Sequence, residues 1–163
     1  MRVALIGPRG VGKTTLGAPL ADALGVPFFD GDLVVEQKTG QTIAKLFDDG
    51  TFRDREWDVT QDLLRVHEGV IAFGGGAVMA SGFAAAVAGW TVVLLTAAPI
   101  VLAERIRSAG GARPSLTGAE PAEEIAAVWE QRRNHYEALA DFSAATDTLD
   151  IGSVLAPLIA RLR

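Results

Sequence analysis

The chain has 163 residues, of which 49% are hydrophobic and 21% are charged, and its net charge is -5 at pH 7. This length suits a single globular domain, residues 1–163, and the composition excludes an intrinsically disordered chain. The acidic balance without a basic cluster argues against a nucleic-acid partner, and the absence of cysteine excludes disulfides and thiolate metal sites.

The N-terminal residues and the apolar runs bear on where the protein works. The first predicted strand begins at about Arg2, which leaves no room for a signal peptide. No apolar run approaches the ~18 residues that a membrane-spanning helix needs. We therefore expect a cytoplasmic monomer that has no membrane partner and acts on a small molecule.

Residues 7–15, with the sequence GPRGVGKTT, match the pattern G-x-x-x-x-G-K-[ST] of phosphate-binding loops. The apolar run 3–6 predicts a buried strand before them, and residues 15–24 predict a helix after them. Glycines let backbone N–H groups converge on phosphate oxygens, Lys13 would bridge the β and γ phosphates, and the Thr14 hydroxyl would bind Mg²⁺. We expect ATP or GTP, contacted by Gly10, Val11, Gly12, Lys13, Thr14 and Thr15. The alternative is a glycine-rich turn that binds nothing.

After this unit, short apolar strands alternate with helices to the end of the chain. Strands are predicted at about 27–29, 70–73, 91–95 and 145–149. Helices are predicted at about 33–48 with a break near Gly40, and at 51–68, 83–88, 100–107, 121–140 and 154–162. This order predicts an α/β fold with a five-stranded parallel sheet flanked by helices, in which ligands bind at the carboxyl ends of the strands.

Asp30 and Asp32 follow the second predicted strand and therefore belong to the ligand-binding edge of the sheet. Residues two apart in an extended chain point the same way. One carboxylate could support a metal through water while the other accepts a proton from a substrate hydroxyl. The alternative is that Asp32 caps the following helix.

Arg53 and Glu56 lie three residues apart on the helix predicted at 51–68 and are neighbours on its surface. Glu56 falls on the apolar arc of that helix, where a carboxylate needs a partner, and Arg53 is the nearest candidate. A fixed guanidinium can also bind a substrate carboxylate through two hydrogen bonds. The alternative is an ordinary surface ion pair.

Arg132 lies near the centre of an apolar stripe on the helix predicted at 121–140. There it either pairs with a buried acid or holds an anionic ligand, and we favour the ligand.

The three glycines 74–76 end a strand and allow close backbone approach to a substrate, although a plain loop would also explain them. Arg113 follows two glycines in a polar segment and is typical of a mobile lid arginine at about 108–119, with a solvated loop charge as the alternative.

From end to end, the order of these motifs resembles that of the shikimate kinases: the loop 7–15, Asp30-Gly31-Asp32, Phe52-Arg53-Asp54-Arg55-Glu56, Gly74-Gly75-Gly76, Arg113-Pro114 and Arg132. The resemblance implies a sheet like that of nucleoside monophosphate kinases, with a lid loop. It also implies phosphorylation of the 3-hydroxyl of shikimate by MgATP, a step towards chorismate and the aromatic amino acids.

For the reacting groups, the resemblance implies that Asp32 holds hydroxyls of shikimate and acts as the base. Asp30 would support Mg²⁺ through water beside Thr14. Lys13 and the lid arginine Arg113 would act on the transferring phosphoryl group. The adenine contacts are less defined, and Arg107 is our candidate for them.

For the acceptor, the resemblance implies a binding region at about 31–60, completed by later residues. Arg53 and Arg132 would clamp the carboxylate of shikimate, Gly75 would contribute a backbone contact, and Glu56 would hold Arg53.

Three rival interpretations remain. Gluconate kinases share a similar Asp-Gly-Asp stretch but lack the arginine and triple-glycine set. A nucleotide-dependent switch protein usually needs a second acid at the end of an apolar strand, and the Asn-Lys-x-Asp motif that reads guanine is absent. A catalytically inactive relative would bind nucleotide alone.

Overall fold

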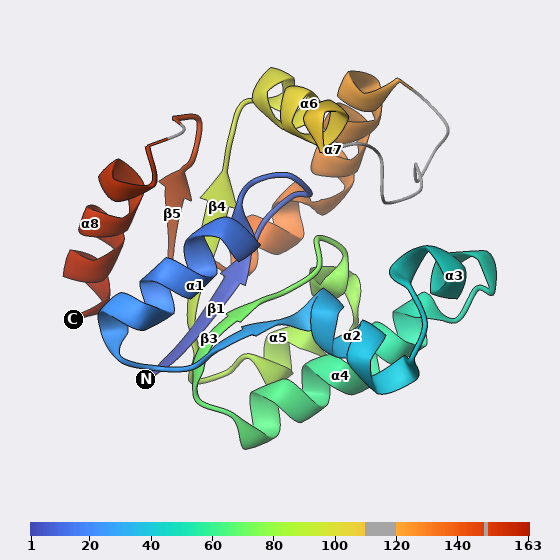
Figure 1. Ribbon diagram of the computed structural model, residues 1–163, viewed down its shortest axis with the longest axis horizontal. Helices are drawn as coiled ribbons and strands as arrows, with labels where there is room; N and C mark the ends of the chain where they lie inside the picture. Colours follow the sequence, from blue (N-terminus) through green and yellow to red (C-terminus); the bar gives the residue numbers. More distant parts are fainter. Residues whose placement is uncertain (110–119, 149) are drawn as a thin grey trace.

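The structure is a computed structural model that describes residues 1–109, 120–148 and 150–163. At its centre lies a five-stranded sheet with all strands parallel, in the order β2-β3-β1-β4-β5 (Figure 1). The strands are β1 (Arg2–Ile6), β2 (Phe28–Asp30), β3 (Gly69–Ala72), β4 (Thr91–Thr96) and β5 (Phe142–Ala145). The predicted five-stranded parallel sheet is therefore confirmed.

Helices connect the strands and cover both faces of the sheet (Figure 1). They are α1 (Lys13–Leu24), α2 (Gly31–Thr39), α3 (Ile43–Asp48), α4 (Phe52–Val66), α5 (Phe83–Ala86), α6 (Pro99–Ser108), α7 (Pro121–Leu139) and α8 (Ile151–Leu162), with a short 3₁₀ turn η1 (Ala77–Met79). Among the described residues, none of these helices has the length and apolar composition needed to cross a membrane.

The core has two halves because successive side chains of a strand point to opposite faces. On one face, Val3 and Leu5 of β1 pack with Leu16 of α1 and with apolar residues of α6 and α8. On the other, Ala4 and Ile6 pack with α2, α4 and α5. Both faces of the strands are therefore buried, which explains why they appear as continuous apolar runs in the sequence.

The last strand differs from its prediction. It was expected at about 145–149 and lies instead at Phe142–Ala145, in register with the end of β4. Asp150 accepts a hydrogen bond from the Gly152 N–H at 3.0 Å and caps α8, so this helix begins at Ile151 and the chain has already left the sheet. Burial along β5 alternates between half-buried and exposed, which leaves a weak apolar signal.

The break that the sequence predicts near Gly40 in the helical stretch 33–48 is confirmed, and it divides the stretch into α2 and α3. Gly40 ends α2 with φ 66°, a left-handed conformation that favours glycine, and its N–H donates to the Glu36 carbonyl. Thr42 then caps α3 by accepting from the Lys45 N–H. The carboxyl ends of β1, β2 and β3 lie side by side, so the segments that follow them meet at one edge of the sheet.

Candidate active site

The phosphate-binding loop connects β1 to α1 and depends on left-handed glycines. Gly10 and Gly12 have φ values of 80° and 97°, and α1 begins at Lys13 directly after them. The Lys13 ammonium donates to the carbonyl oxygens of Gly7 at 2.7 Å and Pro8 at 2.9 Å, so it lies across the mouth of the loop. The helix N-terminus and this ammonium together favour an anion at the loop.

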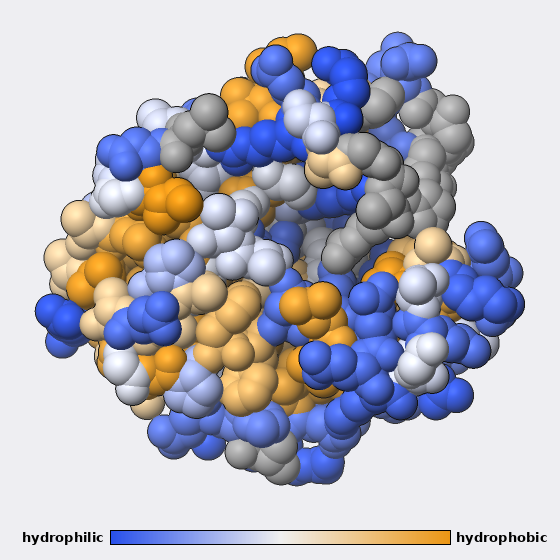
Figure 2. Space-filling view, in the orientation of Figure 1, coloured by the Kyte–Doolittle hydropathy of each residue, from blue (hydrophilic) through white to orange (hydrophobic). Residues whose placement is uncertain are grey.

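A cavity of about 660 Å³ opens over the loop, and the surface is hollowed in this region (Figure 2). Its wall includes residues 9–16 of the loop and α1. Two groups of residues complete the lining: Asp30, Asp32, Ala72, Phe73, Gly74 and Gly75 at one side, and Arg105, Ile106, Ala109, Thr146, Thr148, Ile151 and Val154 at the other. The cavity therefore extends from the residues that follow β2 and β3, across the phosphate-binding loop, to the residues that follow β4 and β5.

Asp30 and Asp32 separate into two environments. Asp30 Oδ1 accepts from the backbone N–H groups of Asp32 at 3.0 Å and Leu33 at 3.2 Å, so Asp30 caps α2. Its other oxygen, Oδ2, accepts from the Thr14 hydroxyl at 2.5 Å. Asp32 lies in the first turn of α2, is only 8% exposed, and lines the cavity. The alternative in which Asp32 is the helix cap is therefore wrong.

Glu56 is a buried carboxylate that holds an arginine. Arg53 Nη1 donates to Glu56 Oε2 at 2.5 Å, and the guanidinium lies 5.1 Å from the Phe52 ring centroid. Glu56 is 6% exposed and its Oε1 has no hydrogen-bond partner among the described residues. Burial raises the pKa of Glu56, and the charge of Arg53 opposes that rise. With one partner this buried, the pair is not an ordinary surface ion pair.

The three glycines after β3 let charged side chains converge. A Cβ at Gly74 would collide with Glu56 Oε1 and come within 2.9 Å of Asp32 Oδ1. A Cβ at Gly76 would come within 2.5 Å of Cζ of Arg53. At Gly75 the nearest atom to such a Cβ is Arg132 Nη1, at 3.4 Å. The segment therefore brings together an acid from α2, the ion pair of α4 and an arginine from α7.

Tyr136 fixes this arrangement from α7, and in the sequence it belongs to the apolar stripe that surrounds Arg132. Its hydroxyl donates to the Gly75 carbonyl at 2.5 Å, and its side chain is 1% exposed. Burial raises the pKa of Tyr136, and the neighbouring Arg132 opposes that rise. Tyr136 lies four residues after the half-buried Arg132, on the same helical face, so both reach the glycine segment.

Comparison with known proteins agrees with this geometry. The family model for shikimate kinase matches residues 9–163. The chain belongs to the shikimate kinase family. This match confirms the resemblance that the motifs indicated. The chain is therefore an ATP-dependent phosphotransferase, and its fold is like that of the nucleoside monophosphate kinases.

Relatives cover almost the whole chain. A shikimate kinase from Mycobacterium tuberculosis (strain ATCC 25177 / H37Ra) is 41% identical over 167 aligned positions, which cover 99% of this chain and 93% of the relative. The solved structure of shikimate kinase from Acinetobacter baumannii in complex with shikimate has a TM-score of 0.91 at 29% identity, covering 98% of this chain and 91% of that one. A gluconokinase from Sinorhizobium meliloti, at 19% identity and a TM-score of 0.62 over 99% of this chain and 94% of that one, shares the fold alone.

The cavity is also lined by an arginine that the sequence analysis did not identify. Arg107, our candidate for adenine contacts, is exposed and does not line the cavity, whereas Arg105 does. Leu102 of α6 is buried, and Arg105 and Ile106 follow it by three and four residues on the same face, a spacing that could have identified them. Arg113, the predicted lid arginine of the kinase, lies outside the described residues.

Proposed function

We propose that this chain transfers the γ-phosphoryl group of ATP to the 3-hydroxyl of shikimate, with Mg²⁺ as the metal. The observation that carries the proposal is the convergence of Asp32, Arg53 and Arg132 on the glycines 74–76, beside the phosphate-binding loop. Two cations and one acid are the groups that a carboxylated polyol requires. Gluconate is also a carboxylated polyol, but the gluconate kinases lack the arginine and triple-glycine set, and a purely nucleotide-binding protein needs no acceptor site.

The two arginines bind the acceptor's carboxylate in this proposal. Arg53 is oriented by Glu56 and by the ring of Phe52, and Arg132 reaches the same segment from α7. A guanidinium that is already held in place loses little entropy when it binds a carboxylate. Gly75 contributes a backbone contact to the acceptor.

Asp32 is the base that takes the proton. As the 3-hydroxyl oxygen forms its bond to the γ-phosphorus, the bond from that phosphorus to the bridging oxygen breaks, ADP leaves and the hydroxyl proton passes to the Asp32 carboxylate. Lys13 holds the β and γ phosphates, and Arg113, which lies outside the described residues, acts on the transferring phosphoryl group as the predicted lid arginine.

Thr14 and Asp30 are the residues that hold Mg²⁺ in this proposal. Their side-chain oxygens lie 2.5 Å apart at the phosphate loop, and hydroxyl and carboxylate oxygens are the ligands that this ion prefers. The bound ion supplies positive charge that offsets the charge of the phosphates.

At the other end of the cavity we propose that Arg105, rather than Arg107, lies closest to adenine.

The direct test is a coupled assay of ADP release, in which shikimate, gluconate and nucleoside monophosphates are offered separately. Shikimate alone should raise ADP release, and the product should carry phosphate on the 3-hydroxyl. A response to gluconate would favour the gluconate kinase alternative, and no response to any acceptor would leave only nucleotide binding. Size-exclusion chromatography tests the accompanying expectation that this single-domain, cytoplasmic protein is a monomer.

A further inference from the structure

Thr146 connects the end of the sheet to the phosphate-binding loop. It directly follows β5 and is 3% exposed. Its hydroxyl oxygen lies 2.7 Å from the Val11 carbonyl, 3.2 Å from the Thr96 carbonyl and 3.3 Å from Arg105 Nη1. A hydroxyl has one proton to donate, and the shortest distance assigns that proton to Val11. Arg105 donates to the same oxygen and leaves the proton directed at the loop.

The hydrogen bond from Thr146 fixes the orientation of the peptide between Val11 and Gly12. This peptide is trans, so its C=O and N–H point in opposite directions. Because the Val11 carbonyl is held towards Thr146, the Gly12 N–H of the same peptide points away from Thr146. That N–H belongs to the group that would face the phosphates.

No steric contact at Gly12 fixes the orientation of the Val11–Gly12 peptide among the described residues. Gly12 has φ 97°, and within the described part of the chain no atom beyond Gly12 and its two chain neighbours lies within 4 Å of the place where its Cβ would stand. A glycine in open space can rotate its peptide at little steric cost. The orientation of the N–H therefore depends on the partner of the Val11 carbonyl, and that partner is Thr146.

Arg105 holds the carbonyl of the preceding peptide, between Gly10 and Val11, as Thr146 holds the carbonyl of Val11. Its Nη2 donates to the Thr146 carbonyl at 2.5 Å, and its Nη1 reaches the Gly10 carbonyl at 3.5 Å. Residues from α6 and from the end of β5 therefore hold two successive carbonyls of the loop, those of Gly10 and Val11. Arg105 and Gly10 are 95 residues apart in the sequence, so the motif of the loop alone does not predict their contact.

We propose that Thr146 is a positioning residue that orients the Val11–Gly12 peptide so that its N–H can bind a nucleotide phosphate. This inference rests on the proposed function in one respect, namely that the loop binds ATP. Thr146, which directly follows β5, should therefore affect the affinity for the nucleotide and not the affinity for the acceptor.

Calorimetric titration with ADP and Mg²⁺ tests the proposal in three variants of the whole chain. Thr146→Val keeps the shape of the side chain and removes the donor, so the buried Val11 carbonyl loses its partner; we expect the Kd for ADP to rise about tenfold. Thr146→Ser restores the hydroxyl and should bind within about twofold of the wild type. Thr60→Val, which removes an equally buried hydroxyl from α4, should not change ADP affinity.

A titration with shikimate alone separates positioning from general damage. Its Kd should be the same in Thr146→Val and in the wild type. Equal ADP affinity of the valine variant and the wild type, equal weakening of the valine and serine variants, or a parallel loss of shikimate affinity would each overturn the proposal. Thr146→Ala replaces the valine variant if the latter does not fold. A wild-type chain that fails to bind ADP would instead contradict the proposed function.

Discussion

Asp30 and Asp32 have the same side chain and lie two residues apart, yet their surroundings give them different tasks. Both oxygens of Asp30 accept hydrogen bonds, from the start of α2 and from Thr14. Asp32 is buried at the cavity wall, next to the glycines 74–76. In the proposed function, Asp30 therefore serves the nucleotide and its metal, and Asp32 serves the acceptor.

Replacement of Asp32 by asparagine should separate catalysis from nucleotide binding. Asparagine keeps the size of the side chain but cannot take the hydroxyl proton, so kcat should fall by about 100-fold or more. The Kd for ADP should change by less than about twofold, because Asp32 is assigned to the acceptor. Steady-state kinetics and ADP titration give both values. A collapse of ADP affinity with kcat retained would show that Asp32 belongs to the nucleotide site.

Removal of the Arg132 guanidinium should weaken acceptor binding specifically. In Arg132→Ala, the KM for shikimate should rise by roughly 30-fold, equivalent to about 2 kcal/mol for the loss of a charged partner from a partly buried pair. The matched control is Arg133→Ala on the same helix, because Arg133 is exposed and pairs with Glu137 at 3.2 Å. An unchanged KM in Arg132→Ala, or an equal rise in both variants, would assign Arg132 a structural role.

Some site residues could be predicted at the residue scale and others could not. The helical spacing of Arg53 and Glu56 predicted their contact, because both lie on one helix. The contacts of Thr146 with Val11 and of Tyr136 with Gly75 join segments 135 and 61 residues apart, and no local pattern specifies them. Such contacts require knowledge of which strand ends lie next to each other.

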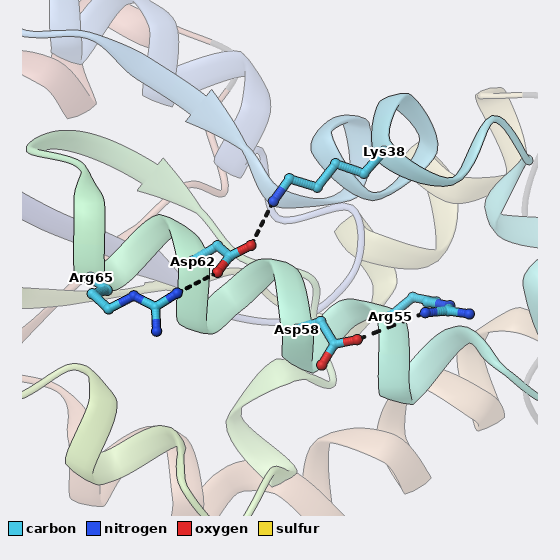
Figure 3. Close-up of polar contacts among 5 residues, drawn as sticks. All are labelled: Lys38, Arg55, Asp58, Asp62 and Arg65. Atoms are coloured by element: carbon cyan, nitrogen blue, oxygen red, sulfur yellow. Dashed lines mark hydrogen bonds and ion pairs between the residues drawn. The ribbon is translucent and has the colours of Figure 1, made fainter.

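At the scale of elements, an exposed network connects α2 to α4 (Figure 3). Lys38 of α2 donates to Asp62 of α4 at 2.7 Å, and Arg65 of α4 donates to the other oxygen of Asp62 at 2.8 Å. The hydrogen bond and charge of Lys38 lower the pKa of Asp62 below its ordinary value of 3.8. The ion pair Arg55–Asp58, at 3.9 Å, lies within α4 and does not reach α2.

Asp62→Asn should reduce the melting temperature slightly at pH 7 and low salt. Because folding lowers the pKa of Asp62, its contribution is fully present above pH 3.8 and is lost as the pH falls through the lowered pKa. The difference from the wild type should therefore shrink below that pH, and also in high salt, since the network is exposed. Asp58→Asn is the control and should change the melting temperature less. A deficit that persists unchanged at pH 2 would contradict the assignment.

Elements with strong periodicity matched their predictions, and so did the break near Gly40, whereas the start of the last helix, which a capping side chain sets, did not. The amphipathic pattern of α4 and the apolar runs of β1 and β4 give bounds close to those observed. The start of α8 depends on the Asp150 cap, and the division between α2 and α3 depends on Gly40 and Thr42. A single capping side chain shifts an element boundary by several residues without changing the hydrophobic pattern.

At the scale of the whole molecule, the strand order decides which segments form the site. The sequence predicted a five-stranded parallel sheet but not the order β2-β3-β1-β4-β5. That order places β1 between β3 and β4, so the phosphate loop lies beside the glycines 74–76, with Asp32 after β2 on their far side. The motifs therefore predicted the participants, while the topology determines their distances.

The account depends most on the acceptor site, and a crystal structure of the chain with shikimate and ADP tests it directly. We predict that the shikimate carboxylate lies between the guanidinium groups of Arg53 and Arg132, and that its 3-hydroxyl lies within hydrogen-bonding distance of Asp32 and faces the β-phosphate of ADP. Shikimate bound elsewhere, or bound here with those three side chains directed away from it, would contradict the account.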